Sequence, residues 1–108
     1  MEDKIRKLWS QANVASQEVP HNHDGVHLSL MFSWVKDGLT RSVIFYQFQT
    51  GWPISIESGA THPTLPLTSG WPKTRAITES DADATWMRTI REAIDEANSF
   101  TQADLQKV

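Results

Sequence analysis

Near the start of the chain, apolar residues recur every three or four positions, which is the spacing of one face of a helix. The residues on this face are Ile5, Leu8, Trp9, Ala12 and Ala15. Acidic residues stand four positions before basic ones, as Glu2 does before Arg6, an order that favours both ion pairing and the helix dipole. The pattern predicts an amphipathic helix over residues 2–16, followed by a turn-forming stretch at 17–25.

A strict alternation of residues begins at 26 and ends at 36, which is the pattern of a half-buried strand. Asp37-Gly38 follows at once, and this dipeptide supplies the two positive φ angles of a type I′ turn. The chain from 39 to 50 is therefore expected to fold back as an antiparallel partner.

This turn also sets the register of the hairpin, with Lys36 opposite Leu39. The same register pairs Phe32 with Val43, Leu30 with Phe45, and Trp34 with Arg41. The last pair predicts a cation–π contact at the surface.

The second face of the hairpin is also apolar, at its middle and at one end. The residues are Met31, Val35, Ile44, Tyr46 and Phe48. Because one helix cannot cover both faces, we expect either that two helices share this work or that a second copy of the chain, as in a homodimer, supplies the cover.

Further along the chain, Ile54-Ser55-Ile56-Glu57 alternates briefly and predicts a third strand. Residues 60–78 contain three prolines and almost no periodicity, so we expect a long irregular loop. A second apolar stripe, preceded by capping residues at 78–83, predicts a helix over 80–97. The end of the chain, 98–108, is either a loosely ordered tail or a short helical turn capped by Thr101, with Phe100 and Leu105 packing back.

These elements predict an α+β fold in the order helix, strand, strand, strand, long loop and helix, with an antiparallel sheet packed on helices. The 108 residues form a single domain over 1–108. Zero cysteines exclude disulfides, thiolate zinc sites and a cysteine nucleophile. No apolar run reaches the length of a membrane span, and no signal peptide is visible, so we expect a cytoplasmic protein. A net charge of −3, with scattered basic residues, argues against nucleic acid as a partner.

One cluster has the spacing of metal ligands, namely His21, His23 and His27, with Asp24 and His62 as further donors. Neutral imidazoles bind transition metals, so Zn²⁺ or Ni²⁺ is the cofactor that this cluster implies. In the alternative interpretation, these histidines are ordinary loop and strand residues, and the protein has no cofactor.

A second feature is the repeated Gly-Trp-Pro at Trp52 and Trp71. Exposed tryptophans often anchor a partner, but each ring could instead cover an edge of the core. Between them, Pro63, Leu65 and Pro66 form a PxxP segment, a spacing found in peptides that bind aromatic grooves. These five residues are the candidate binding residues.

Catalytic motifs are few. Glu57 could act as an acid or base near His62, or simply face water on a strand. We therefore expect a small non-catalytic accessory protein that binds a protein partner through the loop at 51–75 and the less polar face of the sheet. The alternatives are a metal-binding protein or hydrolase that uses the histidine cluster, and a binder of a small apolar or aromatic ligand in a pocket.

Overall fold

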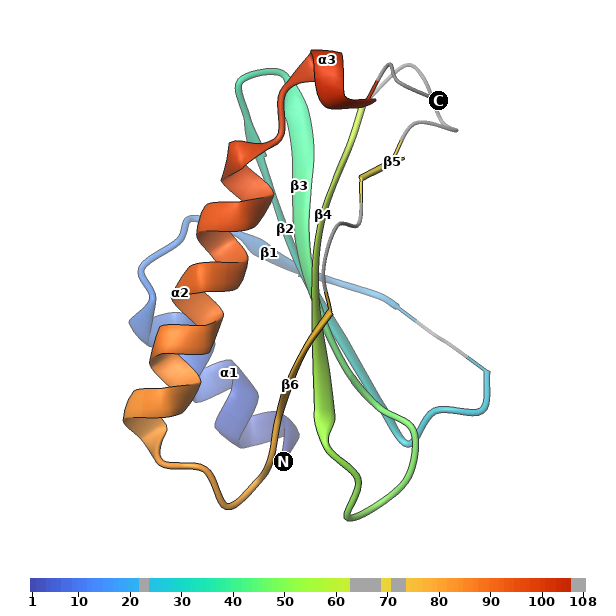
Figure 1. Ribbon diagram of the computed structural model, residues 1–108, viewed down its shortest axis with the longest axis vertical. Helices are drawn as coiled ribbons and strands as arrows, with labels where there is room; N and C mark the ends of the chain where they lie inside the picture. The colour runs from blue at the N-terminus through green and yellow to red at the C-terminus, as the bar shows by residue number, and fades with distance from the viewer. Residues whose placement is uncertain (22–23, 63–68, 71–73, 106–108) are drawn as a thin grey trace.

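A six-stranded antiparallel sheet forms one layer of the protein, and two helices pack on one of its faces (Figure 1). The structure is a computed structural model that describes residues 1–21, 24–62, 69–70 and 74–105. The helices are α1 (Glu2–Gln11), α2 (Asp83–Ser99) and the short α3 (Gln102–Leu105). The strands are β1 (Gln17–Val19), β2 (Leu28–Lys36), β3 (Leu39–Gln47), β4 (Ile54–Thr61), β5 (Ser69–Gly70) and β6 (Thr74–Ile77). The expected α+β fold is confirmed.

The sheet has the order β1-β2-β3-β4, and both β5 and β6 pair with β4. Its central hairpin has the predicted turn and register, although its strands are shorter at their outer ends than the predicted 26–36 and 39–50. Asp37 and Gly38 have φ angles of 53° and 78°, as a type I′ turn requires. The register pairs Phe32 with Val43, Leu30 with Phe45, and Trp34 with Arg41.

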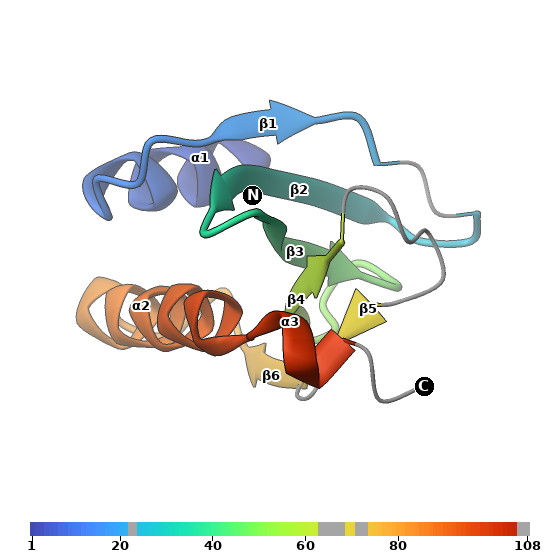
Figure 2. The ribbon, with the colours of Figure 1, turned by 90° about the horizontal axis from the view of Figure 1, so that it is seen from above.

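The core lies between the sheet and the two long helices, because alternate residues of β2, β3 and β4 point toward them. The α2 helix contributes the predicted stripe of buried residues, Trp86, Ile90, Ala93, Ile94 and Ala97. From α1, Trp9 stacks on Phe32 with ring centroids 4.5 Å apart and rings inclined by 12°. Both helices thus cover the same face, as Figure 2 shows, and the expectation that they divide the two faces between them is wrong.

The first helix is shorter than predicted, and a strand lies where only turns were expected. Asn13 has a φ of 56°, so the chain leaves the helix after Gln11. The indole N–H of Trp9 then donates to Ser16 Oγ at 2.8 Å. The three residues of β1 pair with Met31–Ser33 of β2, and Arg6 of α1 holds Glu18 of β1 at 2.8 Å.

The third strand is longer than predicted, since it continues to Thr61 by pairing with the first residues of β3, and it packs against α2. Ser58 is fully buried, and its hydroxyl donates to the carbonyl oxygen of Ala93 at 2.7 Å.

The stretch at 60–78 is not wholly irregular, since β6 pairs with the first half of β4. The second helix begins at Asp83 rather than 80 because Asp81 accepts the backbone N–H of Thr78, closing a turn before the helix.

The predicted surface contact between Trp34 and Arg41 is wrong, because both side chains point into the helix layer. The Trp34 indole donates to Asn98 Oδ1 at 2.9 Å. Arg41 is 2% exposed and donates to the carbonyl oxygens of Ala97 and Phe100. At the end of the described chain, the helical turn expected after Thr101 is confirmed: α3 packs there, and Leu105 is buried.

Candidate functional site

The face of the sheet opposite α1 and α2 carries no helix in the described part of the chain, and we call it the open face (Figure 2). Strand alternation assigns its residues, since the neighbours of each core residue point the other way. Its apolar members are Val19, Met31, Val35, Ile44, Tyr46 and Ala76. Its hydroxyl members are Ser29, Ser33, Thr40, Ser42, Ser55, Thr61 and Thr74.

Charge is distributed unequally between the two faces. Among the described strand residues, Glu57 is the one carboxylate on the open face, and no lysine or arginine shares that face. Charged strand residues point instead toward the helices. Glu18 pairs with Arg6 of α1, and Arg75 pairs with Glu96 of α2 at 2.5 Å. The ionic contacts therefore join the two layers and leave the open face almost uncharged.

Large apolar side chains are nevertheless exposed on and beside the open face. Val35 is 74% exposed, and Phe48 and Trp52, in the loop between β3 and β4, are 46% and 51% exposed. Figure 1 shows this loop bending away from the helices, toward the open-face side. Tyr46 meets Phe48 edge to face, with ring centroids 5.3 Å apart. Not every apolar residue is accessible, because Ile44 is only 6% exposed.

A hollow of about 540 Å³ adjoins the open face where β1 meets the hairpin. Uncharged residues line it, namely Ala15, Ser16, Gln17, Val19, Ser33, Trp34, Val35 and Thr40. Its size suits one or two apolar side chains of a partner, or a small ligand. The ligand pocket expected from the sequence lay between helices and sheet, but large buried side chains such as Trp9, Phe45 and Trp86 occupy that space.

Glu57 lies in an inner strand, between β3 and β6, with two hydroxyl donors around it. Its Oε1 accepts from the Tyr46 hydroxyl at 2.7 Å and from Thr74 Oγ1 at 3.2 Å. Burial first, and then the hydrogen bond to Glu57, raise the pKa of the Tyr46 phenol. In the sequence analysis, Glu57 was placed near His62, and neither Tyr46 nor Thr74 was identified as its neighbour. These contacts depend on how β4 pairs with β3 and with β6, and short stretches of sequence do not specify that pairing.

The histidine cluster is only partly described, since His23 lies outside the described residues. His21 and His27 line one hollow of about 480 Å³ together with Asp24 and Glu2. His21 Nδ1 lies 2.5 Å from Ser29 Oγ, and His27 Nε2 lies 3.4 Å from Thr50 Oγ1. Within the described ranges, no three potential ligands are grouped as a metal site.

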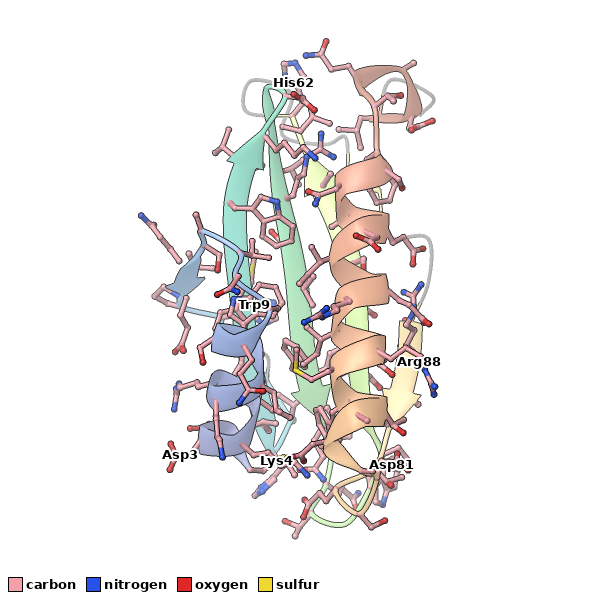
Figure 3. All side chains as sticks on the ribbon, turned by 90° about the vertical axis from the view of Figure 1, so that its left-hand side faces the viewer. Asp3, Lys4, Trp9, His62, Asp81 and Arg88 are labelled. Carbon is pink, nitrogen blue, oxygen red and sulfur yellow. The ribbon has the colours of Figure 1, made fainter. Side chains whose placement is uncertain are left out.

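His62 lies at the opposite end of the molecule from Asp3, as Figure 3 shows, whereas Glu2, the neighbour of Asp3, lines the histidine hollow. The structure therefore does not bring His62 to the cluster as the further ligand that the sequence suggested. Transition-metal binding by the remaining histidines stays a prediction.

Of the five candidate binding residues, the structure describes Trp52 alone. Its exposure shows that the ring does not cover the core, while its carbonyl oxygen accepts from Gln47 Nε2 at 2.8 Å. The remaining four lie outside the described residues, namely Trp71, Pro63, Leu65 and Pro66. Their role in binding stays a prediction.

The helices of the described chain include none that is both long enough and apolar enough to cross a membrane. Comparisons of the chain with protein-family models, with curated proteins and with solved structures give no significant match.

Proposed function

We propose that this chain is a non-catalytic interaction protein that binds a partner protein on its open face and on the adjoining loop between β3 and β4. The observation that carries the proposal is the exposure of Val35, Phe48 and Trp52 beside a sheet face whose described strand residues include a single charged one. The water-facing side of an antiparallel sheet is commonly polar, whereas grouped exposed apolar side chains are typical of contact surfaces.

The chemistry of the face also favours a protein over a nucleic acid. Binding to a phosphate backbone requires lysine or arginine at the surface, and the described strands present neither on the open face. The cores of protein interfaces are instead depleted in charged residues and enriched in methionine and aromatic side chains, which the open face and its adjoining loop present as Met31, Tyr46 and Phe48. The neighbouring hollow of about 540 Å³ offers a recess for an anchoring side chain.

The test replaces exposed apolar groups without adding charge. A double variant, Val35→Gln with Phe48→Gln, is compared with Arg88→Gln, which changes an exposed residue of α2 on the helix side (Figure 3). Proteins that co-purify with the wild type are identified by cross-linking, and binding is then reconstituted from purified components and measured by calorimetry. We expect the double variant to lose binding and Arg88→Gln to retain it.

Two results would contradict the proposal. One is equal binding by the wild type and the double variant when both fold with the same thermal midpoint. The other concerns Ser29, whose hydroxyl lies against His21 in the manner of a nucleophile and its base. Covalent labelling of Ser29 by a fluorophosphonate probe, abolished by His21→Ala, would identify a hydrolytic enzyme instead.

A further inference from the structure

The single carboxylate on the open face indicates what the partner must supply. We infer that the partner is a different protein and not a second copy of this chain, an inference that rests on the proposed function. This partner presents an arginine or lysine side chain to Glu57, surrounded by apolar contacts. Glu57 belongs to a row that crosses the sheet from Met31 through Ile44 to Thr74. A partner that covers this row therefore also covers the carboxylate.

The carboxylate is already oriented before any partner arrives. The Tyr46 hydroxyl and Thr74 Oγ1 both donate to Oε1, at 2.7 and 3.2 Å. Among the described residues, none donates a hydrogen bond to Oε2, and Glu57 is only partly buried. A group held in place by neighbours loses little conformational freedom on binding, so its interaction with a cation adds more to the affinity.

Electrostatics then determines which partner fits. Covering Glu57 removes a charged group from water, which is unfavourable unless a cation or several donors replace the lost hydration. Two neutral hydroxyls already bind one oxygen, and the other oxygen needs a new donor. A guanidinium group, planar and permanently charged, matches a carboxylate better than any other side chain, and an ammonium group is the next best.

A second copy of the chain cannot meet this need through the same face. The described strands contain three basic residues, Lys36, Arg41 and Arg75, and strand alternation puts all three on the helix side. Arg41 binds helix carbonyls, and Arg75 binds Glu92 and Glu96. In their described strands, two open faces placed together would bury two carboxylates and contribute no lysine or arginine. The net charge of −3 on each chain adds long-range repulsion between copies.

The row also gives the spacing that the partner should have. Neighbouring strands lie about 4.8 Å apart, so Met31 on β2 and Glu57 on β4 are separated by roughly 10 Å. We expect the partner to place an apolar side chain and its cation at about this distance. The apolar side chain would contact Met31 and its same-face neighbour Val35, which lines the uncharged hollow.

The experiment uses a random library of twelve-residue peptides displayed on phage, selected against the intact wild-type protein. Selected peptides are synthesised and their affinities measured for the wild type, for Glu57→Gln and for Asp95→Asn. The last is a matched control, because it removes one exposed carboxylate from α2. We expect the selected peptides to contain arginine or lysine, to bind Glu57→Gln at least tenfold more weakly, and to bind Asp95→Asn within twofold of the wild type.

The Val35→Gln/Phe48→Gln variant separates failure of this inference from failure of the proposed function. One outcome would overturn the inference and leave the proposed function standing. In that outcome, the selected peptides lose affinity for the Val35→Gln/Phe48→Gln variant, contain no arginine or lysine, and bind Glu57→Gln as tightly as the wild type. A selection that yields no peptide sensitive to the apolar pair would contradict both. Sedimentation that shows a wild-type dimer, dissociated by the double variant, would establish a second copy as the occupant and also overturn the inference.

Discussion

Replacement of Arg41 by methionine tests the most unusual contact that joins the helix layer to the sheet. Arg41 is a cation in the central hairpin that is 2% exposed. Its Nη1 donates to the carbonyl oxygens of Ala97 at 2.7 Å and Phe100 at 3.0 Å, and its Nε donates to the carbonyl oxygen of Lys36 at 3.1 Å. These acceptors include the last carbonyls of α2, which lack partners within the helix. Arg41 thus caps this helix from the sheet.

The expected loss follows from the three acceptors. A hydrogen bond to a charged group contributes about 1.5–3 kcal/mol, and a buried acceptor left alone costs about 1–3 kcal/mol. A cation at a helix C-terminus adds roughly 0.3–1 kcal/mol. Water can reach the carbonyls of Lys36 and Phe100, and methionine relieves the burial of a charge, so the gains and losses partly cancel. We expect Arg41→Met to lower the free energy of unfolding by about 2–4 kcal/mol.

Urea unfolding followed by tryptophan fluorescence measures this loss. With a denaturant slope near ~1.5 kcal/mol/M, a loss of ~3 kcal/mol lowers the midpoint by about 2 M. Arg41→Lys keeps the charge but lacks the planar fork, so its loss should be about half as large. Arg88→Met removes a guanidinium from the exposed side of α2 and should change stability by less than about 0.5 kcal/mol.

A free energy of unfolding for Arg41→Met within about 0.5 kcal/mol of the wild type would refute this reasoning. It would mean that the carbonyls at the end of α2 find water or other donors at no cost. If Arg41→Lys is as unstable as Arg41→Met, a narrower point is refuted, namely that the positive charge stabilises the end of α2 in addition to the hydrogen bonds of the guanidinium.

Three further outcomes are expected. Gly38→Ala places a side chain at a φ of +78°, and urea unfolding should show a loss of about 1–2 kcal/mol; an unchanged midpoint would contradict the strained turn. Tyr46→Phe removes a phenol whose pKa is raised in the folded state, so the neutral phenol stabilises the wild type at lower pH. The wild type, but not the variant, loses this contribution to its free energy of unfolding as the pH rises above about 10. In urea titrations from pH 8 to 11, the free energy of unfolding of the wild type minus that of Tyr46→Phe should therefore decrease; an increase would contradict the prediction. The metal hypothesis predicts that Zn²⁺ at pH 7.5 binds the wild type one to one in calorimetry and binds His27→Ala more weakly, because the variant lacks one imidazole ligand; equal binding by both would contradict a metal site.

The turn and the register of the hairpin could be predicted because their determinants are local. Alternation defined which residues of each strand face the core, and Asp37-Gly38 fixed the turn and with it every pair across β2 and β3. The stripe on α2 was equally local, since a helix places residues three and four apart on one face. Each of these elements carries its own signal within about twenty residues.

The remaining features depend on contacts between distant segments. β1 has three residues, too few for a periodic pattern, and its place follows from pairing with β2 and from the Arg6–Glu18 ion pair. β6 lies in a stretch with a proline before it and depends on β4 for its hydrogen bonds. An arginine on the inward face of a strand likewise gives no sign that it will cap a helix 56 positions later.

The same limit explains why the candidate site was only partly visible in the sequence. The hairpin has apolar residues on both faces, and nothing local indicates that α1 and α2 would cover the same one. The Glu57 cluster needs the register of β4 with both neighbours, which brings Tyr46 and Thr74 to one oxygen. Exposed apolar residues such as Phe48 could be found from the pattern, whereas the nearly uncharged face around them required the sheet order.

The main apolar cluster of the described residues lies on one side of the sheet. It joins α1, α2 and the inward residues of the strands, and it contains no residue of the open face, although Ile44 on that face is itself buried. Folding therefore gains little from Val35 or Phe48, whose side chains remain largely in water. Apolar area of this kind yields about 25 cal/mol per Å² only when something covers it. The helices do not cover this area, so under the proposed function a partner protein would gain the stabilisation that comes from covering it.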